Sequence, residues 1–154
     1  MEAVTVQDCL VCQEHRGDVP VPGGHLIAND LVVAFHLPPL PDSPQVYQGY
    51  LFVTSRRHAP GFADLDDNEA AAVGQAITRL SRALRSLGAE RVYVVVVGSG
   101  IPHLHVHLVP HWPETPPKVR WIDVDTWDGA RRGGFEETER FTAKVAEQLN
   151  AGHA

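Results

Sequence analysis

Four of the nine histidines in this 154-residue chain fall within nine residues, at His103, His105, His107 and His111. The first three alternate with aliphatic residues, in the order His-Leu-His-Val-His-Leu-Val over residues 103–109. Because successive side chains of a β-strand point to opposite faces, this pattern predicts three imidazoles in a row on one face and an aliphatic core on the other. Near neutral pH an imidazole can act as a nucleophile, a proton donor or a metal ligand.

Two chemistries fit such a row of imidazoles. In the first, histidines at alternate strand positions bind zinc, and a zinc-bound hydroxide is the nucleophile. In the second, one histidine attacks a phosphoryl or acyl centre and forms a covalent intermediate. The row by itself leaves both chemistries open.

The only cysteines, Cys9 and Cys12, form a Cys-x-x-Cys pair. Such a pair can be a redox couple, half of a zinc site, or two ordinary thiols. A thioredoxin-like redox couple needs a βαβ context, and the turn-forming residues 20–24 follow too soon for one. A zinc site needs two further nitrogen or sulfur ligands. Three histidines are available for this role: His15, His58 and His103.

The elements that would position these residues can be read from residue type and spacing. Runs of β-branched and aromatic residues predict strands at 31–36, 50–54, 92–97 and 103–109, with a further short strand at 121–124. Apolar residues at helical spacing predict a long helix over 67–87 and a terminal helix over 135–149. Residues 98–102 would join two of the strands as an antiparallel hairpin. Hairpins with one long helix between them indicate an α+β fold with a mainly antiparallel sheet.

Length and composition limit the classes of protein to consider. A length of 154 residues predicts one domain, spanning 1–154. The net charge of −6 argues against non-specific binding of nucleic acid, because there is no basic excess to neutralise a phosphate backbone, and we expect no nucleic-acid partner. The sequence has no apolar run long enough to cross a membrane and no visible signal peptide. We therefore expect a cytoplasmic protein with no membrane partner.

The sequence resembles the histidine triad (HIT) superfamily, whose motif His-φ-His-φ-His-φ-φ, where φ is apolar, is matched at every position of 103–109. Residues 9–12 resemble the N-terminal Cys-x-x-Cys of many members, 31–36 the first strand of the nucleotide pocket, and 53–65 the strand-to-helix segment. The resemblance implies a HIT-like α+β domain. Its mainly antiparallel five-stranded sheet would carry one long helix and a C-terminal helix, and residues 112–154 would form a C-terminal extension.

The resemblance also implies an activity, namely hydrolysis of a nucleoside phosphate conjugate such as a dinucleoside polyphosphate or a nucleoside phosphoramidate. The middle histidine, His105, would attack the α-phosphorus and form a nucleotidyl-histidine intermediate. His107 would hold a non-bridging phosphate oxygen. The amides of Gly98 and Gly100 could form a small anion-binding concavity, and the Ser99 hydroxyl could assist the leaving group. The alternative for this loop is a plain hairpin turn.

Some HIT members and the related galactose-1-phosphate uridylyltransferases bind zinc, and the corresponding positions here are Cys9, Cys12, His58 and His103. The resemblance thus implies a closed, structural zinc ion and no organic cofactor. It leaves His105 and His107 free for catalysis. It also implies a homodimer.

Two positions depart from the family pattern. Leu37 stands where an acidic or amide side chain usually binds the ribose hydroxyls, and Tyr50 stands where many members carry histidine. These changes keep open a second hypothesis, a nucleotide-binding module without catalysis. Three apolar residues could wall a base pocket or be ordinary core: Phe35, Leu10 and Val11.

Overall fold

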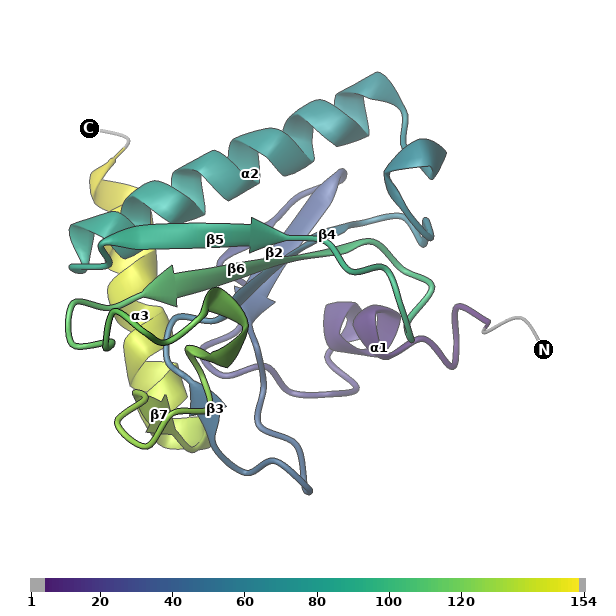
Figure 1. The fold of residues 1–154 in the computed structure, drawn as a ribbon. Helices are drawn as coiled ribbons and strands as arrows, with labels where there is room; N and C mark the ends of the chain where they lie inside the picture. Colours follow the sequence, from purple (N-terminus) through teal and green to yellow (C-terminus); the bar gives the residue numbers. More distant parts are fainter. Residues whose placement is uncertain (1–4, 153–154) are drawn as a thin grey trace.

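The protein is an antiparallel sheet with helices on both of its faces (Figure 1). The computed structural model describes residues 5–152. The helices are α1 (Leu10–Arg16), α2 (Asp67–Ser86), α3 (Phe135–Ala151) and the short 3-10 helices η1 (Phe62–Asp64) and η2 (Trp121–Asp123). The strands are β1 (Ile27–Ala28), β2 (Val32–His36), β3 (Val46–Tyr47), β4 (Leu51–Ser55), β5 (Arg91–Val95), β6 (His105–His111) and β7 (Arg132–Gly133).

Five strands form the main sheet, in the order β1-β2-β4-β6-β5, and every neighbouring pair is antiparallel. The histidine strand β6 lies between β4 and β5. In its register with β4, His105 is opposite Thr54 and His107 is opposite Phe52. The predicted α+β fold, with a mainly antiparallel five-stranded sheet, one long helix and a C-terminal helix, is confirmed.

The hydrophobic core lies between one face of this sheet and helix α2, drawn in teal above the strands in Figure 1. Alternate strand residues point into this core, as strand geometry requires. They include Val32, Ala34, Leu51, Val53, Val106 and Leu108, and Leu104, directly before β6, belongs to the same cluster. Helix α2 presents Val73, Leu80 and Leu84 to them. The predicted division of the histidine strand, with aliphatic side chains on the core face, is therefore present.

The connection between β5 and β6 is longer than the sequence predicts. Strand β5 ends at Val95 and β6 begins at His105, so residues 96–104 form the loop. The register of β5 with β6 ends at the pair Val95–His107, and before β6 the Leu104 N–H donates to the carbonyl of Ala59, 2.7 Å away. His103 consequently leaves the strand, and its side chain is directed by contacts with other segments.

A second difference concerns residues 121–124, for which the predicted strand is wrong. Residues 121–123 form η2, a turn of 3-10 helix closed by a hydrogen bond from the Asp123 N–H to the Arg120 carbonyl. β-Branched and aromatic composition alone does not make a strand when no neighbouring strand accepts its hydrogen bonds. Within residues 5–152, no helix combines the length and apolarity needed to cross a membrane.

Candidate functional site

His105 lies at the start of β6 with its ring orientation fixed by a main-chain group. Its Nδ1 is 2.6 Å from the carbonyl oxygen of His103. A carbonyl oxygen can only accept, so Nδ1 must carry the proton of the neutral ring. The lone pair of the imidazole is therefore on Nε2. This is the arrangement that a nucleophilic histidine requires, because a fixed acceptor on one nitrogen sets the tautomer of the other.

His107 is the second imidazole on this strand, and its ring lies beside that of His105, with 5.0 Å between the centroids. Its Nδ1 is 2.8 Å from the hydroxyl of Tyr50. Burial, and next the nearby His105, lower the pKa of His107 to about 4, so its ring is neutral at pH 7. Tyr50, which departs from the family pattern in sequence, therefore contacts the histidine triad directly.

Phe52 lies at the centre of this face of the sheet and was not identified as a site residue from the sequence. Its ring contacts those of Tyr50, His105 and His107, with centroid distances of 5.8, 5.8 and 5.0 Å. The ring contacts are edge-on, the arrangement that aromatic pairs favour. The alternation within residues 50–54 carried the signal, since it places residues 50, 52 and 54 on the face opposite the core.

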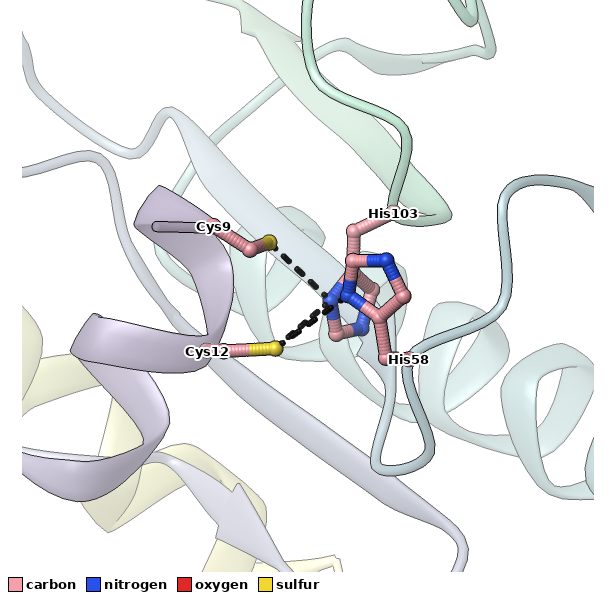
Figure 2. Close-up of side chains that lie close together, drawn as sticks. All are labelled: Cys9, Cys12, His58 and His103. Carbon is pink, nitrogen blue, oxygen red and sulfur yellow. Dashed lines mark hydrogen bonds between the residues drawn. The ribbon is translucent and has the colours of Figure 1, made fainter. Parts of the chain in front are cut away.

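The two cysteines and two histidines form a cluster at the other end of the triad (Figure 2). Cys9 is the N-cap of α1 and Cys12 follows three residues later, so both thiols lie on one side of the helix. Nδ1 of His103 lies 3.5 Å from Sγ of Cys9 and 3.4 Å from Sγ of Cys12. Nδ1 of His58 lies 3.4 Å from Sγ of Cys12. The four ligand atoms all lie within 4.8 Å of one another.

This cluster fits a tetrahedral divalent metal ion. With metal–sulfur and metal–nitrogen bonds of ~2.3 and ~2.0 Å, the sulfur and nitrogen ligands of a tetrahedral zinc ion lie about 3.5 Å apart. The sulfur–nitrogen distances of 3.4–3.5 Å agree with this separation. Burial and the adjacent Cys9 raise the pKa of the Cys12 thiol, so a bound cation would be needed to hold Cys12 as a thiolate.

Neighbouring groups orient the two histidines of the cluster. Nε2 of His103 lies 2.7 Å from the carbonyl oxygen of Ser55, so it donates its proton there and leaves the Nδ1 lone pair facing the thiols. His58 follows Arg57, whose guanidinium makes two hydrogen bonds to the Glu69 carboxylate, at 2.9 and 2.7 Å. This ion pair links the segment that follows β4 to the first turn of α2, and so positions His58, which belongs to that segment.

The three triad histidines do not converge on one point. His103 is turned into the cysteine cluster, whereas His105 and His107 remain together on the strand. Among residues 5–152, the only group of histidine, cysteine or carboxylate side chains with metal-binding geometry is Cys9, Cys12, His58 and His103. The predicted row of three therefore consists of a pair of adjacent rings and a third ring that belongs to another centre.

His15, the third histidine that the sequence offers as a possible zinc ligand, has a different role in the structure. From the last turn of α1 it reaches the sheet, and its Nε2 lies 2.8 Å from the hydroxyl of Thr54. That hydroxyl donates to the Val33 carbonyl, so it accepts from His15. Burial, with a smaller effect of the nearby His103, lowers the pKa of His15 to about 3. It is thus a neutral histidine that packs α1 onto the sheet, and it is not part of the cysteine cluster.

The remaining predicted residues are less closely grouped. Ser99 is exposed in the loop between β5 and β6, where Gly98 and Gly100 have φ angles of 69° and 89°. Phe35 is fully buried against the rings of other residues, whereas Val11 packs with the two cysteines and Ile101. Leu10 is partly exposed at the start of α1. The assignments of Ser99 to catalysis and of the other residues to substrate binding stay predictions.

Comparison with solved structures gives chains of the same fold at low sequence identity. A HIT-like protein involved in cell-cycle regulation from Bartonella henselae has a TM-score of 0.69 and 17% identity, covering 95% of this chain and 99% of that one. A hypothetical histidine triad nucleotide-binding protein from Sulfolobus tokodaii has a TM-score of 0.71 and 17% identity, covering 93% of each chain. A zinc-bound histidine triad family protein from Mycobacterium smegmatis has a TM-score of 0.69 and 18% identity, covering 96% of this chain and 99% of that one.

No curated protein matches the sequence significantly. The sequence model of the HIT domain, however, matches residues 21–113, which include the strand-to-helix segment and the whole histidine motif. The matched segment spans strands β1 to β6 and helix α2, and thus the whole main sheet. Proteins of this family are generally nucleotide-binding proteins and hydrolases or transferases of nucleotides. The chain belongs to the HIT domain family.

Proposed function

We propose that the protein hydrolyses a nucleoside phosphate conjugate through a covalent intermediate on His105. The observation that carries the proposal is the 2.6 Å contact between Nδ1 of His105 and the His103 carbonyl oxygen. In the neutral ring this contact leaves the lone pair on Nε2, and the ring is only slightly exposed, in a family of nucleotide-binding proteins and hydrolases. A dinucleoside polyphosphate or a nucleoside phosphoramidate is the proposed substrate class.

In the proposed reaction the Nε2 lone pair of His105 forms a bond to the α-phosphorus. The bond from phosphorus to the leaving oxygen or nitrogen breaks, and the leaving atom keeps that electron pair and takes up a proton. Water then attacks the same phosphorus and releases a proton to the solvent. The phosphorus–nitrogen bond returns its electron pair to Nε2, and a nucleoside monophosphate departs. His107 would stabilise the charge that develops on a non-bridging oxygen.

A substrate panel with a trapping step tests this reaction. Adenosine and guanosine conjugates with phosphoramidate, polyphosphate, fluoride and sulfate leaving groups would be incubated with wild type and His105→Ala. Denaturing quench and mass spectrometry should show a nucleotidyl adduct on His105 in the wild type. The His105→Ala variant should lose more than about 1,000-fold in kcat. Turnover without any adduct, or an active His105→Ala variant, would refute the covalent mechanism.

We further propose that the metal of the cysteine cluster is zinc with a structural role. Two thiols and two imidazoles form a typical ligand set of closed, four-coordinate zinc sites. A histidine triad protein from Mycobacterium smegmatis with the same fold is zinc-bound. The cluster would fasten α1 to the sheet, whereas His105 and His107 would remain free of metal. This division of the histidines argues against a zinc-bound hydroxide held by all three.

Metal analysis of tag-free protein tests the zinc proposal. We expect about one zinc ion per chain in the wild type and a large loss in His58→Gln. His25→Gln is the matched control, because His25 is half-buried near α1 but outside the cluster, with Nε2 bonded to the Glu14 carbonyl. Retention of zinc by His58→Gln, or an equal loss in both variants, would contradict the assignment.

Leu37 supports a second candidate function, nucleotide binding without catalysis. Its apolar side chain cannot accept a hydrogen bond from a ribose hydroxyl, although it occupies the position where the family usually has an acceptor. Nucleotide affinity in calorimetry with no turnover of any conjugate in the panel would favour this alternative. Turnover of any conjugate through the His105 adduct would exclude it.

A further inference from the structure

Tyr50 contacts His107, the one triad ring that is oriented by neither a carbonyl nor a thiol among the described residues. It precedes β4 and is half-buried, and its hydroxyl oxygen lies 2.8 Å from Nδ1 of His107. The two rings meet edge-on, with 5.8 Å between their centroids. The ring of Phe52 contacts both of them, at 5.8 Å from Tyr50 and 5.0 Å from His107. The hydroxyl is therefore held beside the imidazole by packing as well as by the hydrogen bond.

The other nitrogen of His107 has no partner. Nε2 is buried below the accessible surface, and it makes no hydrogen bond to any residue in 5–152. A buried polar atom without a partner is costly in a folded protein, so such an atom calls for an explanation. A group that is satisfied only when substrate is present provides one.

The direction of the Tyr50–His107 hydrogen bond decides what this unpartnered nitrogen can do. A phenol is a stronger proton donor than an imidazole N–H, and an imidazole nitrogen is a stronger acceptor than a phenol oxygen. Burial, with a smaller effect of Asp125, raises the pKa of Tyr50 to about 12, while the pKa of His107 is lowered to about 4. Both groups are thus neutral at pH 7. The favoured hydrogen bond therefore runs from the Tyr50 hydroxyl, the stronger donor, to Nδ1 of His107, the stronger acceptor.

We propose that the Tyr50 hydroxyl donates a hydrogen bond to Nδ1 of His107 and so holds the proton of that imidazole on Nε2. The Nε2–H group then donates a hydrogen bond to a non-bridging oxygen of the substrate phosphate. Tyr50 is in this sense a positioning residue. Its effect on catalysis rests on the proposed function, whereas its effect on the tautomer does not.

The two strand histidines then have opposite tautomers for a simple chemical reason. His105 faces a main-chain carbonyl, which can only accept, and its proton is on Nδ1. His107 faces a hydroxyl, which donates, and its proton is on Nε2. One ring therefore offers a lone pair and its neighbour offers an N–H. This combination favours attack on phosphorus, because charge grows on the phosphate oxygens as the new bond forms and the N–H can stabilise it.

The tautomer can be measured directly in the substrate-free, metal-loaded protein. Long-range proton–nitrogen correlation spectra of 15N-labelled protein distinguish a protonated imidazole nitrogen from an unprotonated one. For wild type we expect an unprotonated Nδ1 and a protonated Nε2 on His107, with the reverse pattern on His105. Tyr50→Phe should convert His107 to a mixture of tautomers or to the Nδ1-protonated form, and leave the His105 signals unchanged.

Tyr47→Phe is the matched control. Tyr47 is also buried, and its hydroxyl donates to the Pro110 carbonyl, so the variant loses a buried tyrosine hydrogen bond in the hydrophobic core. It should leave the His107 tautomer unchanged. A protonated Nδ1 on His107 in wild type, or an unchanged His107 pattern in Tyr50→Phe, would overturn the proposal.

Kinetics on any conjugate that the wild type cleaves give the second measurement. Loss of one donor to a developing charge lowers kcat by about 100- to 1,000-fold. A mixture of tautomers keeps part of that donor, so we expect kcat to fall by about 10-fold or more in Tyr50→Phe, with KM little changed. A shifted tautomer with unchanged kcat would overturn the catalytic part of the proposal. If the wild type cleaves nothing, the proposed function fails, and the spectra still decide whether Tyr50 sets the tautomer.

Discussion

His36 provides a quantitative test of how the segment directly before Tyr50 is held. It ends β2, its side chain is fully buried on the helix side of the sheet, and its ring meets that of Phe141. Its Nδ1 lies 2.9 Å from the Leu37 carbonyl, and its Nε2 accepts a hydrogen bond from the Gly49 N–H, also at 2.9 Å. The neutral ring therefore bridges the two segments that lead into the site.

The pH dependence of this bridge follows from its burial. Desolvation lowers the pKa of His36 from 6.5 to about 4, against a smaller opposing effect of the Leu37 carbonyl. The unfolded chain thus binds a proton on this residue before the folded chain does. The stability that the neutral ring contributes is complete above pH ~6.5 and is lost as the pH falls towards 4. At ~1.4 kcal/mol per tenfold change, the loss between pH 7.5 and 4.5 is about 2.5 kcal/mol.

Urea unfolding of wild type and His36→Gln at both pH values measures this loss. At pH 7.5 the variant should be less stable, because at least one of the two hydrogen bonds is lost, by about 1 to 2 kcal/mol. At pH 4.5 that difference should disappear or reverse, since glutamine does not titrate. Burial also lowers the pKa of His15, His103 and His107, but their contribution cancels in the comparison. Parallel losses in the two proteins would refute the reasoning.

Three further outcomes can be checked. Removal of the metal by a chelator should lower the melting temperature by several degrees, because the seven-residue α1 is then no longer linked through its cysteines to His58 and His103, and added zinc should restore it. An unchanged melting temperature would count against a structural metal. We propose that a second copy pairs along β5, one of the two edge strands of the main sheet. Val94→Lys should then reduce a dimer to a monomer in light scattering, whereas the similarly exposed Ile122→Lys should not; a dimeric Val94→Lys protein would place the interface elsewhere. Asp66→Ala should cost about 1 kcal/mol in urea unfolding, because the Asp66 side chain accepts from the Glu69 N–H at the start of α2; no change would mean that this cap contributes nothing.

The sequence predicts the main elements because each is determined by local periodicity. The alternation within 103–109 and the helical spacing within 67–87 both correspond to elements of the structure. The short strands β1, β3 and β7 have two residues each, too few for any periodicity, and they exist because a partner strand lies opposite. Helix α1 was not predicted either, because seven residues do not give a clear apolar stripe.

The candidate site, too, is predicted from the sequence only in part. The residue types and their spacing identify the histidines and cysteines, and the family resemblance groups Cys9, Cys12, His58 and His103 as one cluster. Neither indicates that Tyr50 reaches His107. The two residues are far apart in the chain, and their contact depends on the register between β4 and β6. From the sequence, Tyr50 is recognised only as a position where many family members carry histidine, which suggests a loss of function. In the structure the same residue contacts the triad.

His103 joins the two centres through different parts of one residue. Its imidazole faces the thiols of the cysteine cluster, while its main-chain oxygen accepts a hydrogen bond from Nδ1 of His105. A substitution such as His103→Ala removes the ligand but keeps the oxygen atom. The activity of that variant would therefore report how far the rigidity of the anchored helix is transmitted to the nucleophile. Exchange of this one side chain would therefore test the effect of metal binding on the activity of His105 while the main-chain acceptor of its Nδ1 proton is kept.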